Sequence, residues 1–267
     1  MKIIRHLTSS GPAYAALQPD GSAREIAGDI LGDFRVTDRT VNPGKRLAPI
    51  VPPSILAIGL NYKKHAEEGG KGVPAQPMLF LKSLNALQNP GDPIEIPQHL
   101  ASTEVDFECE LAVVIGKRCK NVSKADALKY VLGYTCANDV SARDWQIRWG
   151  GGQFCQGKSF DTFCPLGPVL VTADEIPNPN ALGIKTILNG TALQDWNTND
   201  MCFDVPTLIE FLSGSKTLLP GTVILTGTPH GVGFARKPPI YLKAGDTVSI
   251  EIEKIGTLTN PVINEPL

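Results

Sequence analysis

The sequence lacks the long apolar segments and the leader that mark membrane and secreted proteins. No run approaches the roughly 20 apolar residues needed to cross a bilayer. The opening MKIIRHLTSSG has neither the hydrophobic region nor the cleavage site of a signal peptide. We therefore expect a protein of a reducing compartment, the cytoplasm, with a mitochondrial location left open.

The chain is also short of paired cysteines and of net charge. Its 6 cysteines are scattered without a Cys-x-x-Cys pair, so neither a zinc knuckle nor a disulfide framework is indicated, and we interpret them as small buried hydrophobes. With 27 acidic against 25 basic residues the net charge is −2. No basic field is available for a nucleic acid or an anionic membrane, and we expect neither as a partner.

Several catalytic signatures are missing as well. The sequence has no G-x-S-x-G elbow, no H-E-x-x-H helix and no G-x-G-x-x-G after a strand. The glycines of residues 226–233 are too irregular for a nucleotide cradle, although they indicate close backbone approach to something small. We expect no nucleotide cofactor.

Turn signals followed by strand signals fill most of the 267 residues. Residues 1–48 have the pattern of short strands with a hairpin turn at Asp20 and Gly21, and we expect a small N-terminal subdomain there. Residues 49–267 form the second expected domain. There a Pro/Gly turn precedes a β-branched run at PIEIP (93–97), TVILTG (222–227) and TVSIEIE (247–253). Helices are expected at residues 61–68, 123–132 (with Ser123 as N-cap) and 204–212. The predicted fold class is α+β and β-rich.

Two glutamates stand within a strand pattern that should be buried. The apolar run in residues 105–115 predicts a strand on which Glu108 and Glu110 point to the same face. Two like charges there repel each other and resist desolvation unless a cation compensates them. With Asp139 as a third oxygen ligand, the set favours Mg²⁺ or Mn²⁺, with Ca²⁺ as a substitute, over zinc. The alternative is that both glutamates lie on the solvated face of an amphipathic strand.

Other residues could complete such a site. Lys158 could offset the excess negative charge of three carboxylates around a divalent ion; the alternative is an ordinary surface lysine. His65 and Glu68 lie three apart and share a helix face, where the carboxylate can orient the imidazole as a general base. Gly69 and Gly70 follow and suit a segment that orders over substrate. The alternative for this stretch is a solvated helix of mixed charge.

Read in order, several segments resemble the fumarylacetoacetate hydrolase (FAH) family, in particular its FAH-domain-containing and 2-hydroxyhepta-2,4-diene-1,7-dioate isomerase-like members. They are GLNYKKHAEE (59–68), FLKS (80–83), DFECELAVVIG (106–116), GY (133–134), NDVSARD (138–144), GKSFD (157–161) and TGTPHGVG (226–233). The resemblance covers residues 50–262. It implies a FAH-type mixed β-sandwich or β-roll core beside the small N-terminal subdomain, and a homodimer.

The same resemblance implies roles for individual residues. Mg²⁺ or Mn²⁺ would be bound by Glu108, Glu110 and Asp139. The catalytic residues would be the dyad His65 and Glu68, on a segment that closes over substrate, and Lys158, which would face the metal-bound ligand. Substrate contacts would come from Tyr62, Phe80, Lys82, Arg143, Gln146 and Thr228.

The reaction is less determined than the site. The family shares this site among several reactions of small 2-oxo or 2-hydroxy-dienoic acids, in which a metal stabilises an enolate. We expect hydrolysis of a carbon–carbon bond in an acylpyruvate or fumarylpyruvate type of substrate. The alternatives are an oxaloacetate decarboxylase or tautomerase, a dienoate isomerase or hydratase, and a catalytically silent metal-binding protein. The His65 and Glu68 pair favours an active enzyme.

Overall fold

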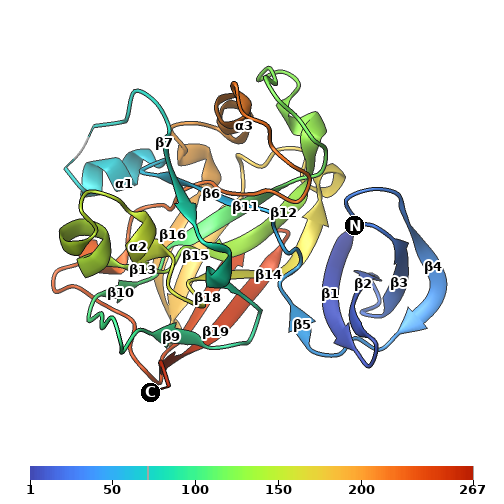
Figure 1. The fold of residues 1–267 in the computed structure, drawn as a ribbon, viewed down its shortest axis with the longest axis horizontal. Coiled ribbons are helices and arrows are strands. Elements are labelled where there is room, and N and C mark those ends of the chain that lie inside the picture. The colour runs from blue at the N-terminus through green and yellow to red at the C-terminus, as the bar shows by residue number, and fades with distance from the viewer. Residues whose placement is uncertain (71, 267) are drawn as a thin grey trace.

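The N-terminal segment forms an antiparallel meander. The computed structural model describes residues 1–70 and 72–266. Its first strands are β1 (Lys2–Thr8), β2 (Gly11–Leu17), β3 (Ala23–Gly28), β4 (Phe34–Val41) and β5 (Arg46–Leu47). The predicted turn at Asp20 and Gly21 lies between β2 and β3, which pair from Leu17 opposite Ala23. This meander stands beside the main body, and β1 joins the two because it also pairs with β14 (Figure 1).

The main body contains a large sheet that continues from the meander. Its order is β4-β3-β2-β1-β14-β12-β11-β17-β6-β7, and β5 and β8 pair with it off this path. The additional strands are β6 (Ile55–Gly59), β7 (Met78–Lys82), β8 (Leu87–Gln88), β11 (Cys109–Ile115), β12 (Val131–Asn138), β14 (Cys164–Thr172) and β17 (Val223–Leu225). Every residue of β11 is buried, as its apolar sequence CELAVVI requires.

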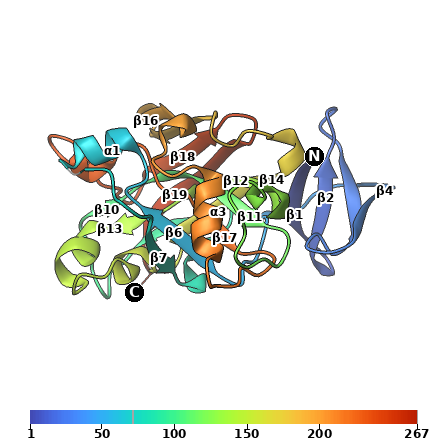
Figure 2. The same ribbon diagram turned by 90° about the horizontal axis from the view of Figure 1, so that it is seen from above.

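A second sheet packs on the first. It runs β16-β15-β18-β19-β9, and a separate pair joins β10 to β13. The bounds are β9 (Ile94–Ile96), β10 (Val105–Asp106), β13 (Ser141–Ala142), β15 (Gly183–Leu188), β16 (Thr191–Asn197), β18 (Thr247–Ile252) and β19 (Gly256–Asn264). β18 and β19 lie over β12 and β14 as a separate layer, and their buried faces form the core (Figure 2). The fold is therefore the expected β-rich α+β arrangement of packed sheets.

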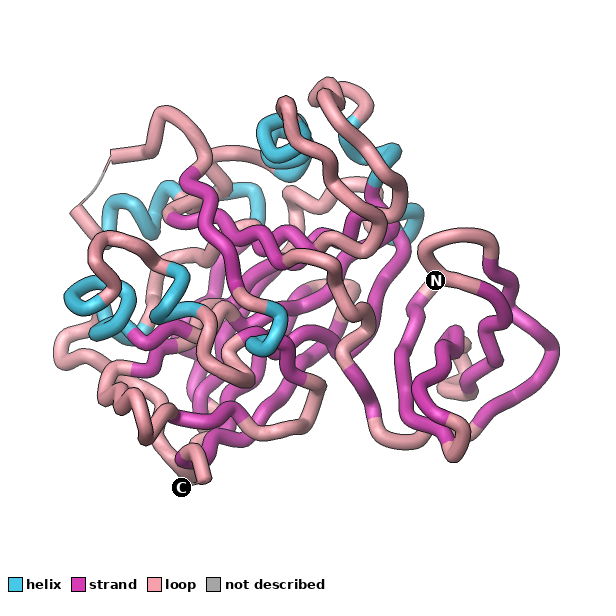
Figure 3. The backbone as a smooth tube through the Cα atoms, viewed as in Figure 1, coloured by secondary structure: helices cyan, strands magenta, loops and turns pink. Residues whose placement is uncertain are grey.

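Helices are short and decorate this sandwich (Figure 3). They are α1 (Lys63–Glu68), the π-helix η3 (Asp144–Trp149), α2 (Cys155–Lys158) and α3 (Val205–Ser213). The 3₁₀ turns are η1 (Leu84–Ala86), η2 (Ala127–Tyr130), η4 (Ala173–Glu175), η5 (Thr198–Asp200) and η6 (Gly233–Ala235). Asp204 caps α3 by accepting the Thr207 backbone N–H, which confirms the predicted helix start. Within residues 1–70 and 72–266, no helix is both long and apolar enough to cross a membrane.

The helix predicted at residues 123–132 is wrong. Only the 3₁₀ turn η2 forms there, and the chain enters β12 at Val131. Ser123 bonds the Asp126 side chain instead of capping a helix. Residues 131–138 pair with β11 on one side and β14 on the other, so long-range strand pairing outweighs the local helical pattern.

Candidate active site

Three carboxylates meet where β11 begins and β12 ends. The antiparallel register places Cys109 opposite Asn138, so the neighbouring residues Glu108 and Asp139 lie side by side, and the Asp139 backbone N–H donates to the Glu108 carbonyl at 3.0 Å. Glu110 follows on β11. Ligand oxygens of Glu108, Glu110 and Asp139 all lie within 4.8 Å of one another, and the three residues are buried. The alternative of a solvated strand face is wrong for Glu108 and Glu110.

The predicted strand at residues 105–115 is interrupted in the structure. β10 ends at Asp106 and β11 begins at Cys109, which leaves Phe107 and Glu108 outside a strand. Asn138 compensates, because its side-chain oxygen accepts the Glu108 backbone N–H at 3.0 Å. The break turns Glu108 toward a cavity, while Glu110 remains deeper.

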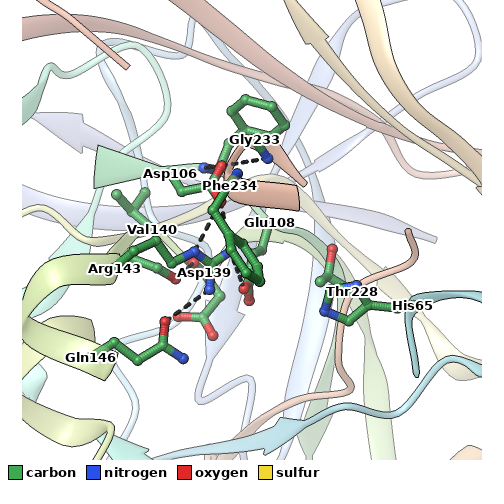
Figure 4. A network of polar contacts seen from close by, with 12 residues as sticks. His65, Asp106, Glu108, Asp139, Val140, Arg143, Gln146, Thr228, Gly233 and Phe234 are labelled. Atoms are coloured by element: carbon green, nitrogen blue, oxygen red, sulfur yellow. Dashed lines mark hydrogen bonds and ion pairs between the residues drawn. The ribbon is translucent and has the colours of Figure 1, made fainter. Parts of the chain in front are cut away.

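Three buried cations brace the carboxylates. Lys158 Nζ lies 2.8 Å from Glu108 Oε2 and 2.7 Å from Asp139 Oδ2. Lys82 Nζ lies 2.6 Å from the other Asp139 oxygen, Oδ1. Arg143 Nη2 lies 2.7 Å from Glu108 Oε1 and 2.8 Å from Asp106 Oδ2 (Figure 4). The alternative of Lys158 as an ordinary surface lysine is wrong, since its ammonium is buried between two carboxylates.

The charges within this cluster do not cancel. Burial alone would raise the pKa of Glu108, but Lys158 and Arg143 outweigh it and hold that pKa well below its ordinary value. The pKa of Glu110 shifts in the opposite direction. Burial, then repulsion from Asp139 and Glu108, raises it well above the ordinary range. With Asp106 included, four carboxylates face three cations, which leaves one negative charge when Glu110 is ionised.

This donor set fits a hard divalent cation. All three groups are carboxylates, the ligand type that Mg²⁺, Mn²⁺ and Ca²⁺ prefer. A cation at Glu110 would relieve the repulsion that otherwise favours its protonated form. Each carboxylate oxygen has two lone pairs, so the bonds from Lys82 and Lys158 leave Asp139 able to bind a metal.

Lys158 reaches the cluster because α2 packs closely on the chain before it. A Cβ on Gly157 would lie 2.5 Å from the Gln146 backbone nitrogen and 2.7 Å from the Ala142 carbonyl oxygen, so only glycine permits this approach. The letters GQFCQGKS, residues 152–159, also match the G-x-x-x-x-G-K-[ST] pattern of nucleotide-binding loops. The context differs: the segment follows the π-helix η3 instead of a strand, and its lysine binds carboxylates.

A cavity of about 310 Å³ opens over this cluster. Glu108 and Lys158 form its charged wall, and Ile58, Met78, Phe80, Phe154 and Phe234 form an apolar one. Among the predicted residues, the cavity is lined by His65, Phe80, Glu108, Arg143, Gln146, Lys158 and Thr228. Residues that are far apart in the sequence, from Ile58 to Phe234, therefore line a single small-molecule cavity.

His65 and Glu68 form the predicted pair at the edge of this cavity. His65 Nδ1 lies 3.0 Å from Glu68 Oε2, and Glu68 Oε1 accepts the Gly231 backbone N–H at 2.9 Å. Burial raises the pKa of Glu68, but the hydrogen bonds from His65 and Gly231 outweigh it and leave that pKa below its ordinary value. Glu68 can only accept when ionised, so His65 Nδ1 carries the proton of this bond, and in the neutral imidazole Nε2 is the acceptor.

Tyr62 and Lys82 lie away from the cavity lining. Tyr62 is fully buried behind the strands, in an isolated bridge with Met201, and burial raises the pKa of its hydroxyl. Lys82 is enclosed behind Asp139 and also donates to the Val140 carbonyl at 3.2 Å. Lys82 supports the carboxylate cluster through Asp139, and neither Lys82 nor Tyr62 lines the cavity, so their substrate contacts stay predictions.

Two residues of the site were not recognised from the sequence. Asp106 accepts Arg143 Nε at 2.9 Å and the backbone N–H groups of Gly233 and Phe234 at 2.8 and 3.0 Å, so it ties the guanidinium to the loop over the cavity (Figure 4). Asp106 lies two residues before Glu108 in the predicted strand, and this spacing could have identified it as a residue of the site. Gln194 braces β11 from the second sheet, and no motif or spacing marks it.

Comparison with known families and proteins agrees with this geometry. The family model described as fumarylacetoacetate (FAA) hydrolase C-terminal matches residues 54–263, and the Rv2993c-like N-terminal model matches residues 1–46. The chain belongs to the fumarylacetoacetate hydrolase family and is an enzyme of that family, so a catalytically silent protein is not supported.

Individual relatives have more specific names. "Oxaloacetate tautomerase fahd2, mitochondrial" of Xenopus laevis is 52% identical over 218 residues, which are 81% of this chain and 68% of that protein. The structure named 2-hydroxyhepta-2,4-diene-1,7-dioate isomerase, from Mycobacterium marinum, is 42% identical with a TM-score of 0.85 over 100% of both chains. A structure named fumarylacetoacetate hydrolase, from Exiguobacterium antarcticum, is 34% identical with a TM-score of 0.90 over 99% of this chain and 100% of that one.

Proposed function

We propose that this chain is a Mg²⁺- or Mn²⁺-dependent isomerase of small 2-oxo dicarboxylic acids, and that it interconverts the keto and enol forms of oxaloacetate. The observation that carries the proposal is that His65 and Glu108 line the same 310 Å³ cavity, so a proton acceptor faces the edge of a carboxylate cluster suited to a metal. Glu108, Glu110 and Asp139 are the proposed ligands.

The charge of the site suits an anionic substrate. With Glu110 ionised, the four carboxylates and three cations sum to one negative charge, which a divalent ion would convert to one positive charge. A small dianion would then be attracted into a cavity with apolar walls, where electrostatic interactions are stronger than in water.

The bound cation would supply Lewis acidity at the oxygens of the 2-oxo acid. His65 Nε2 would take a proton from the methylene carbon next to the ketone, and Glu68 would hold the imidazole and stabilise its charge. Lys158 would donate toward the ketone oxygen as negative charge develops there. The same imidazole would return its proton to that oxygen, so the keto form becomes the enol without loss of atoms.

Hydrolysis was the first expectation from the sequence, and the comparisons change the order of preference. The relative named a tautomerase is 52% identical and the structure named an isomerase is 42% identical, whereas the structure named a hydrolase is 34% identical. Tautomerisation and isomerisation move a proton and add no water. Phe80, Phe154 and Phe234 on the cavity wall would keep water from the reacting carbon.

The test begins with metal-stripped protein and two substrates. Oxaloacetate and acetylpyruvate are each incubated with and without Mg²⁺ or Mn²⁺, while the enol absorbance is followed and pyruvate is assayed separately. Metal-dependent enol–keto relaxation of oxaloacetate without pyruvate is the expected result. Pyruvate from acetylpyruvate would instead support hydrolysis, and pyruvate from oxaloacetate alone would support decarboxylation. No metal-dependent change with either would overturn the proposal.

We also propose that the chain forms a homodimer. Strand β7 ends the large sheet, and its residues Met78 and Leu81 are exposed apolar side chains, of which Met78 also lines the cavity. An edge strand with exposed apolar residues favours association with another chain. Light scattering on Leu81→Lys and on the natural chain tests this: a monomer in both would contradict it.

A further inference from the structure

Gln194 is a buried side chain that joins three parts of the site. It lies on β16, in the second sheet. Its Oε1 accepts the Cys109 backbone N–H at 3.0 Å and the Thr186 hydroxyl at 2.7 Å. Its Nε2 donates to Thr228 Oγ1 and to the Pro229 carbonyl, both at 2.8 Å. All four hydrogen-bonding positions of the amide are therefore used.

We propose that Gln194 is a positioning residue that directs the hydrogen of the Thr228 hydroxyl toward the cavity, where it can act as a hydrogen-bond donor. Thr228 would then bind an anionic oxygen of the substrate. The proposal deepens the function above and rests on it for the identity of that substrate.

The orientation of the amide follows from its partners. A backbone N–H such as that of Cys109 can only donate, so the atom facing it must be the oxygen of Gln194. The carbonyl of Pro229 can only accept, so the atom facing it must be the nitrogen. The contacts with Cys109 and with Pro229 therefore assign the same orientation to the amide. An exchange of its oxygen and nitrogen would create two repulsive contacts.

The polarity of Thr228 follows from that orientation. Its oxygen already accepts a hydrogen from Gln194, so its own hydrogen must point elsewhere. Thr228 lines the cavity, as does His65, and the two lie on the same side in Figure 4. The Cys109 thiol is a second neighbour, but a thiol sulfur is only a weak hydrogen-bond acceptor.

A hydroxyl with a fixed donor role distinguishes ligands by polarity. A free threonine hydroxyl could either donate or accept, whereas this one favours carboxylate, carbonyl or enolate oxygens. A hydrogen bond to a charged acceptor would change binding by roughly 10-fold to 100-fold.

The decisive variant is Gln194→Glu, which keeps the shape of the side chain. One carboxyl oxygen still accepts from Cys109 and Thr186, but the other, when the group is ionised, cannot donate and would draw the Thr228 hydroxyl toward itself. The measured quantities are the Kd of oxalate in the presence of Mg²⁺, by calorimetry, and kcat and KM for oxaloacetate. We expect oxalate to bind roughly 10-fold to 100-fold more weakly.

A double-mutant cycle separates this role from a structural one. In a Thr228→Val background, Gln194→Glu should change the oxalate Kd by less than about 2-fold, because the hydroxyl it acts through is gone. Thr228→Ser keeps the hydroxyl and should retain binding. Thr186→Val removes a hydroxyl from the acceptor end of the same amide and serves as the matched control. It should leave the oxalate Kd within about 2-fold of the natural value.

Three outcomes would overturn the inference. The first is unchanged oxalate binding in a folded Gln194→Glu protein. The second is an equal increase in the oxalate Kd on Gln194→Glu substitution whether residue 228 is threonine or valine. The third is no oxalate binding by the natural protein with Mg²⁺. If Gln194→Glu does not fold, Thr228→Val and Thr228→Ser decide alone: equal Kd values for these two would contradict the donor role. A natural protein that binds oxalate but does not tautomerise oxaloacetate would refute only the proposed function.

Discussion

The carboxylate cluster and the His65 helix face the same cavity but are built in opposite ways. The cluster lies between paired strands, where Lys82 and Asp139 have fully buried side chains only 2.6 Å apart. Helix α1 has six residues and no side-chain N-cap, and the side chains of His65 and Glu68 remain 12% and 22% exposed. The carboxylate cluster is held by buried ion pairs between strands, whereas α1 is held by few bonds.

The difference follows from what each part has to do. Three like charges within 4.8 Å of one another need surrounding cations and pairing strands to hold them together. An isolated helix shorter than about 12 residues is marginal in water, so α1 depends on contacts such as Lys64 N–H to Asp200 Oδ2 and Gly231 N–H to Glu68 Oε1. Such an element can yield as substrate enters. Substitutions in the cluster should therefore lower the free energy of unfolding most, and substitutions in α1 should act mainly on catalysis.

Asp139→Ala should have the largest effect. It leaves the ammonium groups of Lys82 and Lys158 buried with fewer partners, and breaking such buried pairs costs about 3–5 kcal/mol. We expect this loss in the free energy of unfolding of the metal-free protein, measured in urea, together with loss of Mn²⁺ binding. Asp139→Asn is the control, because its amide oxygen still accepts one lysine. An Asp139→Ala protein as stable as the natural one would contradict the idea of a cross-braced cluster.

His65→Gln tests the other side of the comparison. Removal of a general base lowers kcat by about 10²-fold to 10⁴-fold, while a substitution at a partly exposed helix residue should change the free energy of unfolding by no more than about 0.5 kcal/mol. The Mn²⁺ affinity should stay the same. If Mn²⁺ affinity falls together with kcat, the two regions are not independent.

The sequence predicts most of what local spacing controls. The two-residue spacing predicts Glu108 and Glu110 on one side, and both join the cluster, although β11 begins only at Cys109. Helical spacing pairs His65 with Glu68. Asp139 was expected as a third ligand, and the β11–β12 register places it beside Glu108. These assignments needed only the period of one element or the meeting of two neighbouring strands.

The remaining features depend on long-range topology. Lys82 comes from an edge strand and meets Asp139 across 57 positions, so no local pattern reveals the pair. Gln194 meets Cys109 across 85 positions and two sheets. The failed helix at residues 123–132 has the same origin, because strand partners far along the chain decide the structure of residues 131–138.

Lys82→Met distinguishes a brace from a substrate contact. If Lys82 only orients Asp139, the Mn²⁺ affinity should fall by about 10-fold to 100-fold, as for other residues that hold a metal ligand in place. The KM for oxaloacetate at saturating metal should change little. A higher KM with unchanged Mn²⁺ affinity would instead indicate that Lys82 contacts the substrate.

Glu68→Gln should have the smallest effect, and its pH dependence shows how loosely α1 is coupled to the fold. The folded-state pKa of Glu68 lies below the ordinary value of 4.5, so its ionised form contributes stability above pH 4.5 that is lost as pH falls through the lowered pKa. The group is only half-buried, so solvent screening keeps this contribution below about 1 kcal/mol.

The measurement is the difference in the free energy of unfolding between Glu68→Gln and the natural protein, from urea titrations at several pH values. Groups common to both proteins cancel in this difference. It should be largest near neutral pH and vanish at acid pH, because a protonated Glu68 and the uncharged amide of the variant then differ little in charge. A constant difference across this range would mean that the Glu68 side chain acts through its shape, and the charge-based account of the dyad would fail.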